Sequence, residues 1–395
     1  MEQSIQKTPR IEVVDALRGF AVLAILLVHH AEHFIYPVYP ENSPAWLQAL
    51  DQGLNSVVFA LFAGKAYAIF ALLFGLTFFI QYSNQRKKGN DFGWRFLWRL
   101  LLLIVFATLN AVFFPAGDVL LLFVAVGWVL VLTRKWSDKA VLVTACLFLL
   151  QPIEWFHYVA GLINPSHQMP DLGVGAMYAK VGEQVKSGDF RAFVRCNIGL
   201  GQKASLLWAV EAGRFVQTGG LFLLGAYIGR KQLFLSTEKN FAFWTKVLIT
   251  ASLLFAPLFA LKELVSTQYP ALKPSLGTVL NMWQSLSFTA VITASFVLLY
   301  QSARFQRVVS DLRFYGRMSL TNYVSQSFIG ALIYFPIGLN LAPRCGITFS
   351  LLIAVVVFFL QVAFSKWWLS THRQGPLETL WHRWTWVGTE KEKPA

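Results

Sequence analysis

The sequence predicts an all-α protein, a bundle of about ten transmembrane helices that forms one integral membrane domain over residues 1–395. Of its residues, 56% are hydrophobic and only 14% are charged, whereas soluble domains average about 25% charged residues. The mean hydropathy is +0.52. Apolar segments of about twenty residues, the length that crosses a hydrocarbon layer, recur along the chain. They lack the alternating short strands of a membrane β-barrel.

The apolar segments set the expected order of elements. The ten spans are 12–36, 54–82, 95–114, 117–133, 139–162, 204–229, 241–261, 276–301, 316–336 and 346–368. No small-residue cleavage site follows the first segment, and we interpret it as a retained span rather than a signal peptide. Residues 163–203 are expected to form an extracytoplasmic segment, and residues 369–395 a cytoplasmic tail.

Positive charges predict the orientation of these spans. They gather in the loops on the side of the N-terminus, as the positive-inside rule describes. The residues are Arg86, Lys87, Lys88, Arg134, Lys135, Lys139, Arg230, Lys231, Lys239, Arg304, Arg307, Arg313, Arg373 and Arg383. We therefore expect both termini to lie in the cytoplasm.

The net charge and the cysteines argue against nucleic-acid binding, a metal site and a disulfide framework. The 34 Lys and Arg against 20 Asp and Glu give a net charge of +14. The positive-inside bias accounts for this charge, so we expect no nucleic-acid binding. Cys146, Cys196 and Cys345 are scattered along the chain, so they indicate neither a metal site nor a disulfide framework.

Two ionisable residues lie inside the first apolar segment. Arg18 and His29 are eleven residues apart, a spacing that returns to within roughly 20° of one helix face about 16 Å further along. Ionisable groups at membrane depth usually face a polar cavity. We therefore expect both residues to line one water-accessible cavity, with Arg18 nearer the cytoplasm. The alternatives are a snorkelling anchor for Arg18 and an interhelical hydrogen bond for His29.

Several motifs along the chain resemble one family. They are Arg10-Ile-Glu-Val-Val-Asp15-Ala-Leu-Arg18-Gly19-Phe20-Ala21, Gly64-Lys65, Leu72-Leu73-Phe74-Gly75, Gly117-Asp118-Val119-Leu120, Gly316-Arg317-Met318-Ser319-Leu320-Thr321-Asn322-Tyr323 and Gly375-Pro376-Leu377-Glu378-Thr379-Leu380-Trp381. In this order they resemble the YeiB-like family of bacterial membrane proteins. The resemblance spans nearly the whole chain and implies a multi-pass protein of the bacterial inner membrane.

The resemblance also implies an activity. The YeiB-like family is regarded as a branch of the transmembrane acyltransferases, in which cytoplasmic acyl-CoA supplies an acyl group to a sugar or similar acceptor on the far side. The related acyltransferase-3 proteins have an Arg, ten intervening residues and a His on the first helix, and Arg18 and His29 match that spacing. Many YeiB-like members carry Asn at this His position, so this chain departs toward the catalytic pattern. Acyl-CoA, expected to be acetyl-CoA, is therefore the implied co-substrate, and an envelope glycan is the implied acceptor.

Acyl transfer defines the roles that these residues would play. The reaction needs a base beside the acceptor and groups that hold the donor. We assign His29 as the base, ahead of His33 and His30, because an imidazole ordinarily titrates near neutral pH. Arg18 is expected to hold the phosphates or carbonyl groups of CoA in forked geometry, oriented by an ion pair with Asp15. Direct attack and an acyl-histidine intermediate both use the same imidazole.

The other intramembrane polar residues are assigned by depth. Lys65, Arg317 and Asn322 are expected donor contacts, with Arg317 at a helix start whose free N–H groups suit a phosphate. The expected acceptor contacts are His33, Asn110, Asp118, Glu211, Arg214 and Gln217. Ion pairs, helix capping and interhelical hydrogen bonds are the structural alternatives for these residues.

Two other functions are compatible with intramembrane charges. A small-molecule transporter also places Lys, Arg and His along its substrate path, although it favours repeated halves with broken helices, which the sequence does not display. The other alternative is a non-catalytic membrane partner of an envelope-modifying complex.

Overall fold

The described part of the chain is helical throughout. The computed structural model describes residues 11–117, 119–164 and 166–388. The first half contains α1 (Glu12–Ala31), α2 (Ala45–Leu61), α3 (Lys65–Lys87), α4 (Gly93–Ala111), α5 (Val119–Thr133), α6 (Asp138–Leu149), α7 (Pro152–Ile163), α8 (Val174–Ser187), α9 (Phe190–Cys196) and η1 (Asn197–Gly201). The second half contains α10 (Gln202–Glu211), α11 (Arg214–Arg230), α12 (Glu238–Gln268), η2 (Pro270–Leu272), η3 (Lys273–Gly277), α13 (Thr278–Leu299), α14 (Ala303–Val308), α15 (Ser310–Arg317), α16 (Ser319–Tyr334), η4 (Ala342–Arg344), α17 (Ile347–Thr371) and α18 (Pro376–Thr385).

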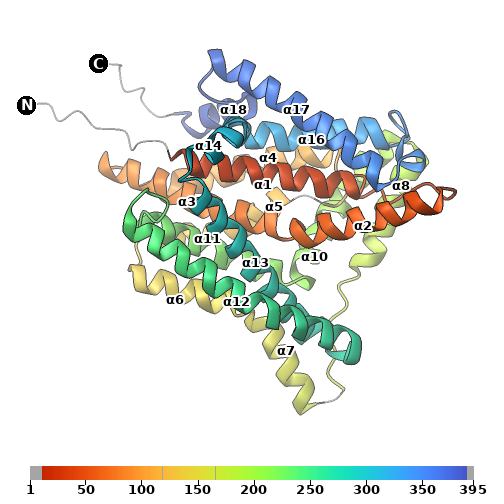
Figure 1. Ribbon diagram of the computed structural model, residues 1–395, viewed down its shortest axis with the longest axis horizontal. Coiled ribbons are helices and arrows are strands. Elements are labelled where there is room, and N and C mark those ends of the chain that lie inside the picture. Colours follow the sequence, from red (N-terminus) through yellow and green to blue (C-terminus); the bar gives the residue numbers. More distant parts are fainter. Residues whose placement is uncertain (1–10, 118, 165, 389–395) are drawn as a thin grey trace, which may run out of the picture.

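Long apolar helices form a bundle in which α1 is flanked by α3, α15 and α17 (Figure 1). Six helical stretches are long and apolar enough to cross a membrane, namely Glu12–Ala31, Ala45–Lys87, Gly93–Ala111, Glu238–Gln268, Pro270–Leu299 and Ile347–Thr371. The pair α6 and α7, bent by 47°, makes a seventh if it is one span. The chain is therefore a polytopic helical membrane protein.

The ten expected spans are all largely helical, but three coincide with short helices. Among the described residues, α5 has 15 residues, α11 has 17 and α16 has 16. A helix rises 1.5 Å per residue, so each is shorter than the ~30 Å hydrocarbon core. By length and composition the structure supports six or seven spans rather than ten.

The two segments expected outside the membrane also contain helices. Residues 163–203 include α8 and α9. Within residues 369–388, the described part of the expected tail, α18 packs against α4 and α16. The described part of the C-terminal segment thus packs on the bundle.

Four glycines allow two close helix crossings. Gly19 of α1 faces Gly316 of α15, and Gly75 of α3 lies in the crossing that contains Gly225 of α11. At each of the four positions an added Cβ atom would overlap a backbone carbonyl oxygen of the partner helix. Small residues at helix interfaces let backbones approach in this way. The crossings hold α1, which carries Arg18 and His29, against α15, and they hold α3 against α11.

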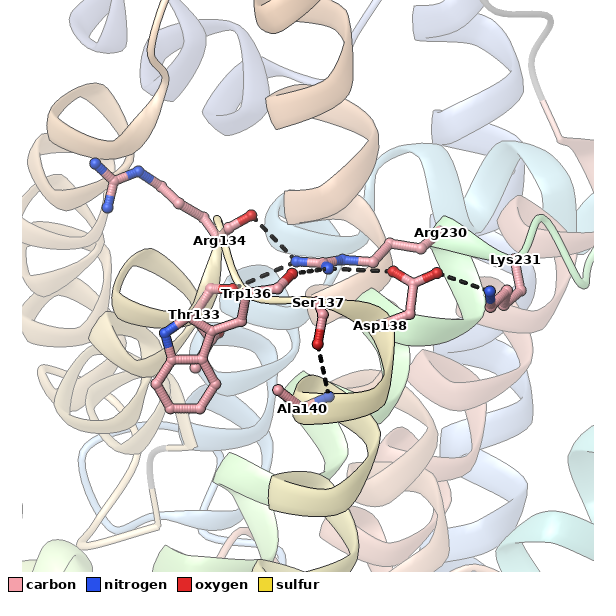
Figure 2. A network of polar contacts seen from close by, with 8 residues as sticks. All are labelled: Thr133, Arg134, Trp136, Ser137, Asp138, Ala140, Arg230 and Lys231. Atoms are coloured by element: carbon pink, nitrogen blue, oxygen red, sulfur yellow. Dashed lines mark hydrogen bonds and ion pairs between the residues drawn. The ribbon is translucent and has the colours of Figure 1, made fainter.

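A polar network joins the ends of α5 and α11 to the start of α6 (Figure 2). The guanidinium of Arg230 donates to the carbonyl oxygens of Thr133, Arg134 and Trp136, at 3.3, 3.1 and 2.6 Å. Asp138 pairs with Arg230 at 3.3 Å and with Lys231 at 2.7 Å. Arg230 therefore satisfies carbonyl groups that have no partner inside α5, because the last turn of a helix leaves its carbonyls free.

Asp91, in the turn before α4, gives the protein a pH-dependent contact. Its carboxylate accepts hydrogen bonds from Arg134 Nε and Nη2, at 3.1 and 2.9 Å, and from the backbone N–H of Gly93 at 2.9 Å. These bonds, with Arg134 first, lower the pKa of Asp91 from 3.8 to about 2. A carboxyl group whose pKa is lower in the folded protein than in the unfolded chain stabilises the fold at pH values above the unfolded pKa. This stabilisation is lost as the pH falls through the pKa of the folded protein.

We therefore expect Asp91→Asn to destabilise the protein at pH 7 by about 0.2–1 kcal/mol, the range of exposed ion pairs. The difference from wild type should shrink as the pH falls from about 4 toward 2. Thermal unfolding in detergent at pH 7, 4 and 3 measures it. A difference that stays constant over this range would contradict the assignment.

Candidate functional site

The bundle contains two cavities, and α1 lines both of them. We call the cavity that Arg18 lines the inner cavity and the cavity that His29 lines the outer cavity. The inner cavity has a volume of about 170 Å³ and is lined by residues of α1, α3, α4, α5, α15, α16 and α18, including Arg18. The outer cavity has a volume of about 950 Å³ and is lined by the end of α1 together with parts of α2, α3, α5, α8, α10 and α11, including His29. The two cavities have no lining residue in common. The expectation that Arg18 and His29 share one cavity is therefore corrected, because each lines a different one.

Arg18 is held in the inner cavity by contacts from two helices. Its Nη1 pairs with Asp15 Oδ1 at 3.1 Å, and its Nη2 donates to Thr77 Oγ1 of α3 at 3.0 Å. The ion pair with Asp15, expected from a spacing of three residues on one helix, is confirmed. The side chain is 19% exposed, so its guanidinium is fixed at a cavity wall and is not a snorkelling anchor.

Arg99 and Arg317 also line the inner cavity. The Arg99 guanidinium carbon lies 3.7 Å from the ring centroid of Trp381, whose indole N–H donates to the Arg99 carbonyl at 3.0 Å. Arg317 Nη2 donates to the carbonyl of Arg373 at 3.1 Å. Three guanidinium groups thus surround one small cavity. Arg99 was not predicted as a site residue, although a cation inside the span 95–114 was a usable signal.

Glu378 of α18 caps the N-terminus of α16. Its carboxylate accepts hydrogen bonds from the backbone N–H groups of Leu320 and Thr321, at 2.7 and 3.1 Å, and from Thr321 Oγ1 at 2.6 Å. Burial raises the pKa of the Glu378 carboxyl above its ordinary value. The expectation that these N–H groups are free for a phosphate is corrected, because Glu378 already occupies them.

Aromatic rings form much of the remaining wall of the inner cavity. Phe70 and Phe74 of α3, Phe123 of α5 and Tyr323 of α16 line it. The ring centroids of Phe74 and Phe123 are 5.2 Å apart, and those of Phe70 and Phe123 are 6.0 Å apart. The cavity is therefore an apolar slot with cationic groups at its wall.

His29 lies among aromatic rings at the wall of the outer cavity. Its ring centroid is 4.7 Å from that of Phe114, 5.4 Å from Phe34 and 6.2 Å from Tyr323. Among the described residues no hydrogen bond holds this imidazole, and Nδ1 is buried without a partner. The alternative of an interhelical hydrogen bond is therefore not observed for His29.

His30 and His33 have structural roles. His30 Nδ1 lies 2.6 Å from the hydroxyl of Tyr334, and His33 Nε2 lies 2.7 Å from Ser350 Oγ. Neither histidine lines the outer cavity. The prediction that His33 contacts the acceptor is wrong, because His33 does not lie on α1. That helix ends at Ala31, and His33 has a φ of 46°. The helical spacing from His29 no longer applies beyond that end.

Arg214 is the expected acceptor contact that does line the outer cavity. Its guanidinium carbon lies 4.4 Å from the Trp208 ring centroid and 5.1 Å from that of Tyr67. Glu32 also lines this cavity, as do Tyr178, Glu183 and Lys186. Tyr178, Glu183 and Lys186 were not predicted as site residues, because α8 is distant in sequence from the other helices of the cavity wall.

Three other expected acceptor contacts do not line the outer cavity. Glu211 Oε1 accepts from the backbone N–H of Leu172 at 3.3 Å. Asn110 is fully buried without a side-chain partner among the described residues, and Gln217 is buried. Asp118 lies outside the described residues.

Two expected donor contacts are placed away from Arg18. Lys65 is buried at the start of α3, where its Nζ lies 3.5 Å from the carbonyl of Phe59. Asn322 Nδ2 donates to the Tyr315 carbonyl at 3.0 Å. Neither side chain lines the inner cavity, so both assignments are corrected. Lys65 starts its helix at the outer end of α3, and Asn322 faces the α15–α17 side of α16.

The chain is thus a multi-pass membrane protein, a helix bundle with two cavities whose walls are mostly apolar. Residues 228–388 match the family model described as "Protein of unknown function (DUF418)". The matched segment includes Arg317, Tyr323 and Glu378, whereas Arg18 and His29 precede it. No solved structure matches the chain.

Three bacterial proteins are similar to the chain over nearly its full length. "Uncharacterized protein YxaH" of Bacillus subtilis is 28% identical, with 96% of this chain and 94% of that protein aligned. "Uncharacterized protein YeiB" of Escherichia coli is 28% identical, with coverages of 94% and 95%. The "Uncharacterized 39.9 kDa protein in amylase 3'region" of Bacillus acidopullulyticus is 26% identical, with coverages of 95% and 94%. The expected resemblance to YeiB is thus confirmed as distant similarity.

Proposed function

We propose that the protein is a membrane acyltransferase, which takes an acyl group from acyl-CoA in the inner cavity and transfers it to an acceptor in the outer cavity. One observation carries the proposal: α1 extends Arg18 into the inner cavity and His29 into the outer one. A group that binds a charged donor and a group that accepts a proton are thereby on opposite sides of one bundle.

The inner cavity suits the reactive end of acyl-CoA. Guanidinium groups bind phosphates and carbonyl oxygens in forked geometry, and Arg18, Arg99 and Arg317 supply three of them. The aromatic slot suits the thin pantetheine arm. Its volume of about 170 Å³ is small beside the 950 Å³ of the outer cavity. A short acyl group such as acetyl fits this space, and acetyl-CoA is therefore the favoured donor.

The outer cavity suits a carbohydrate or similar envelope acceptor. Ligand sites combine apolar walls with a few polar groups that fix orientation. Here Tyr67, Tyr178 and Trp208 offer ring faces, while Glu32 and Arg214 offer charged hydrogen-bonding groups. The volume of about 950 Å³ admits a group the size of a sugar unit.

His29 would act as the base of the reaction. In direct transfer, the imidazole takes the proton of the acceptor hydroxyl while the hydroxyl oxygen attacks the thioester carbonyl. The bond between carbon and sulfur breaks, and the CoA thiolate leaves and takes up the proton. In the covalent route the imidazole nitrogen attacks the thioester carbonyl, the bond between carbon and sulfur breaks, and the CoA thiolate leaves and takes up the imidazole N–H proton. The acceptor hydroxyl then attacks the acyl-imidazole, the bond between carbon and nitrogen breaks, and the hydroxyl proton returns to the imidazole.

We also propose how the chain crosses the membrane. The protein would cross the bacterial inner membrane ten times with both termini in the cytoplasm, and α5, α11 and α16 would cross as short helices in the interior of the bundle. The inner cavity then opens toward cytoplasmic acyl-CoA.

A transporter is the second candidate, favoured by the interrupted helices. The chain bends by 47° between α6 and α7, and α3 follows α2 after a break at Gly64, which has a φ of 77°. Discontinuous helices of this kind line substrate sites in transporters.

Binding of acetyl-CoA tests the proposed donor site. We expect purified protein to bind radiolabelled acetyl-CoA, and Arg99→Gln to weaken binding by roughly 10–100-fold, because a hydrogen bond to a charged group contributes about 1.5–3 kcal/mol. Arg304→Gln is the matched control, since Arg304 is exposed on α14. Thermal unfolding of each variant separates lost binding from lost folding.

Two results would contradict the acyltransferase. One is equal affinity in wild type, Arg99→Gln and Arg304→Gln, which removes the inner cavity as the donor site. The other is uptake of a solute by proteoliposomes without any dependence on CoA, which favours the transporter.

A further inference from the structure

Tyr323 of α16 lies between the two cavities. Its side chain lines the inner cavity, and its ring centroid is 6.2 Å from that of His29, which lines the outer one. The residue is 5% exposed. Tyr323 is thus a direct link between the wall of the donor cavity and the assigned base.

The same division continues across α3 and α5. Tyr67 lines the outer cavity, while Phe70, about one turn further along α3, lines the inner one. On α5, Leu122 lines the outer cavity and the next residue, Phe123, lines the inner one. The Phe123 ring centroid lies 6.3 Å from that of Tyr67 and 6.0 Å from that of Phe70. We name Tyr67, Phe70, Phe123 and Tyr323 the aromatic partition.

The members of the aromatic partition have different neighbours. The Tyr67 hydroxyl is hydrogen-bonded to Thr218 and also donates to the Arg214 carbonyl at 3.3 Å. Phe123 contacts the rings of Phe74 and Phe222 in addition to its partition neighbours. Tyr323 is the member whose ring contacts the imidazole of His29. Of the four residues, Tyr323 is therefore the one placed between the inner cavity and the assigned base.

We propose that Tyr323 is the positioning and specificity-determining residue of the aromatic partition. Its ring separates donor from acceptor, turns aside to let a short acyl group meet His29, and excludes longer chains. Part of this inference, the exclusion of long chains, rests on the proposed acyl transfer. The physical separation of the cavities does not.

Cysteine accessibility tests the separation without any assay of activity. Cys146, Cys196 and Cys345 are first replaced by serine, and His29→Cys is then introduced. A small membrane-impermeant methanethiosulfonate is added to right-side-out or to inside-out membrane vesicles. We expect the thiol introduced by His29→Cys to react from one face only. The thiol introduced by Thr77→Cys, in the inner cavity, should react from the opposite face.

Adding Tyr323→Ala should let the thiol of His29→Cys react from both faces. The rate from the second face should rise by roughly tenfold or more, because removal of the ring leaves a hole in the partition. Tyr323→Phe keeps the ring and should keep the one-sided pattern. Phe328→Ala is the matched control, since Phe328 is on the same helix and 43% exposed.

Two outcomes would overturn the proposal. Reaction of the His29→Cys thiol from both faces with Tyr323 intact would mean that no partition is closed there. One-sided reaction that persists in Tyr323→Ala would mean that Tyr323 does not close it.

The chain-length series tests the specificity. With acetyl-, butyryl- and octanoyl-CoA, Tyr323→Ala should raise kcat/KM for octanoyl-CoA relative to acetyl-CoA by roughly tenfold or more, while Tyr323→Phe leaves the ratio unchanged. An unchanged ratio in Tyr323→Ala would remove the specificity role. Altered cysteine accessibility without transfer from any donor would retain the partition and reject the proposed function.

Discussion

Replacing His29 with alanine should lower acyl-transfer turnover by about 10²–10⁴-fold, the usual contribution of a general base. Its imidazole lines the outer cavity and is not held by a hydrogen bond among the described residues. His30 and His33 cannot replace it, because Tyr334 and Ser350 engage them outside the cavity. Transfer of labelled acetyl from acetyl-CoA, measured with membranes of each variant, gives the rate.

The His29 variant also has an expected property that separates catalysis from binding. Its affinity for acetyl-CoA should stay within about threefold of wild type, since the donor cavity is lined by other residues. His157→Ala is the matched control, because His157 contacts His167 at 2.9 Å and lines neither cavity. Intact turnover in His29→Ala would remove this residue as the base.

Replacing Gly225 with alanine should destabilise the bundle by more than about 3 kcal/mol, beyond the usual cost of overpacking. The added Cβ would overlap the carbonyl oxygen of Leu72 on α3, and its distance to the backbone nitrogen of Leu76 would be 3.0 Å. Backbone atoms cannot move aside as a flexible side chain can, so α3 and α11 must separate. The yield of folded protein and its melting temperature measure the effect.

Gly161 of α7 offers a matched control for this substitution. No atom lies within 4 Å of the Cβ position there, and alanine is favoured over glycine in a helix interior by roughly 0.5–1 kcal/mol. We therefore expect Gly161→Ala to leave stability unchanged or to raise it slightly. Equal stability of Gly225→Ala and wild type would show that the α3–α11 crossing tolerates a wider separation.

The apolar segments were predictable as helices because backbone groups in a hydrocarbon layer must be satisfied within the segment, but the number of spans was not, since α5, α11 and α16 are shorter than the hydrocarbon core. The contact between Asp15 and Arg18 was predictable for a similar reason, since residues three apart on one helix must be neighbours. Both inferences use only local geometry. They hold whatever the surrounding bundle looks like.

The parts of the site that depend on neighbouring helices were not predictable in this way. Arg99 becomes a cavity residue through its contact with Trp381 of α18, a helix interpreted from sequence as part of a tail. Glu32 lines the outer cavity together with residues of α8, which is distant in sequence. The spacing of His29 and His33 failed because the helix ends between them. Contacts between helices that are distant in sequence, and the residue at which a helix ends, cannot be deduced from the spacing of residues within one apolar segment.

The placement of Arg18 and His29 on one uninterrupted helix has a consequence for the shape of any donor. Eleven residues of α-helix fix their Cα atoms about 16 Å apart, and α1 has no break between them. Under the proposed acyl transfer, a donor held by its charged end at Arg18 must carry its thioester along α1 past Tyr323 to reach His29. A long flexible arm between the charge and the labile bond meets that need, which favours acyl-CoA over a compact activated acid such as acetyl phosphate.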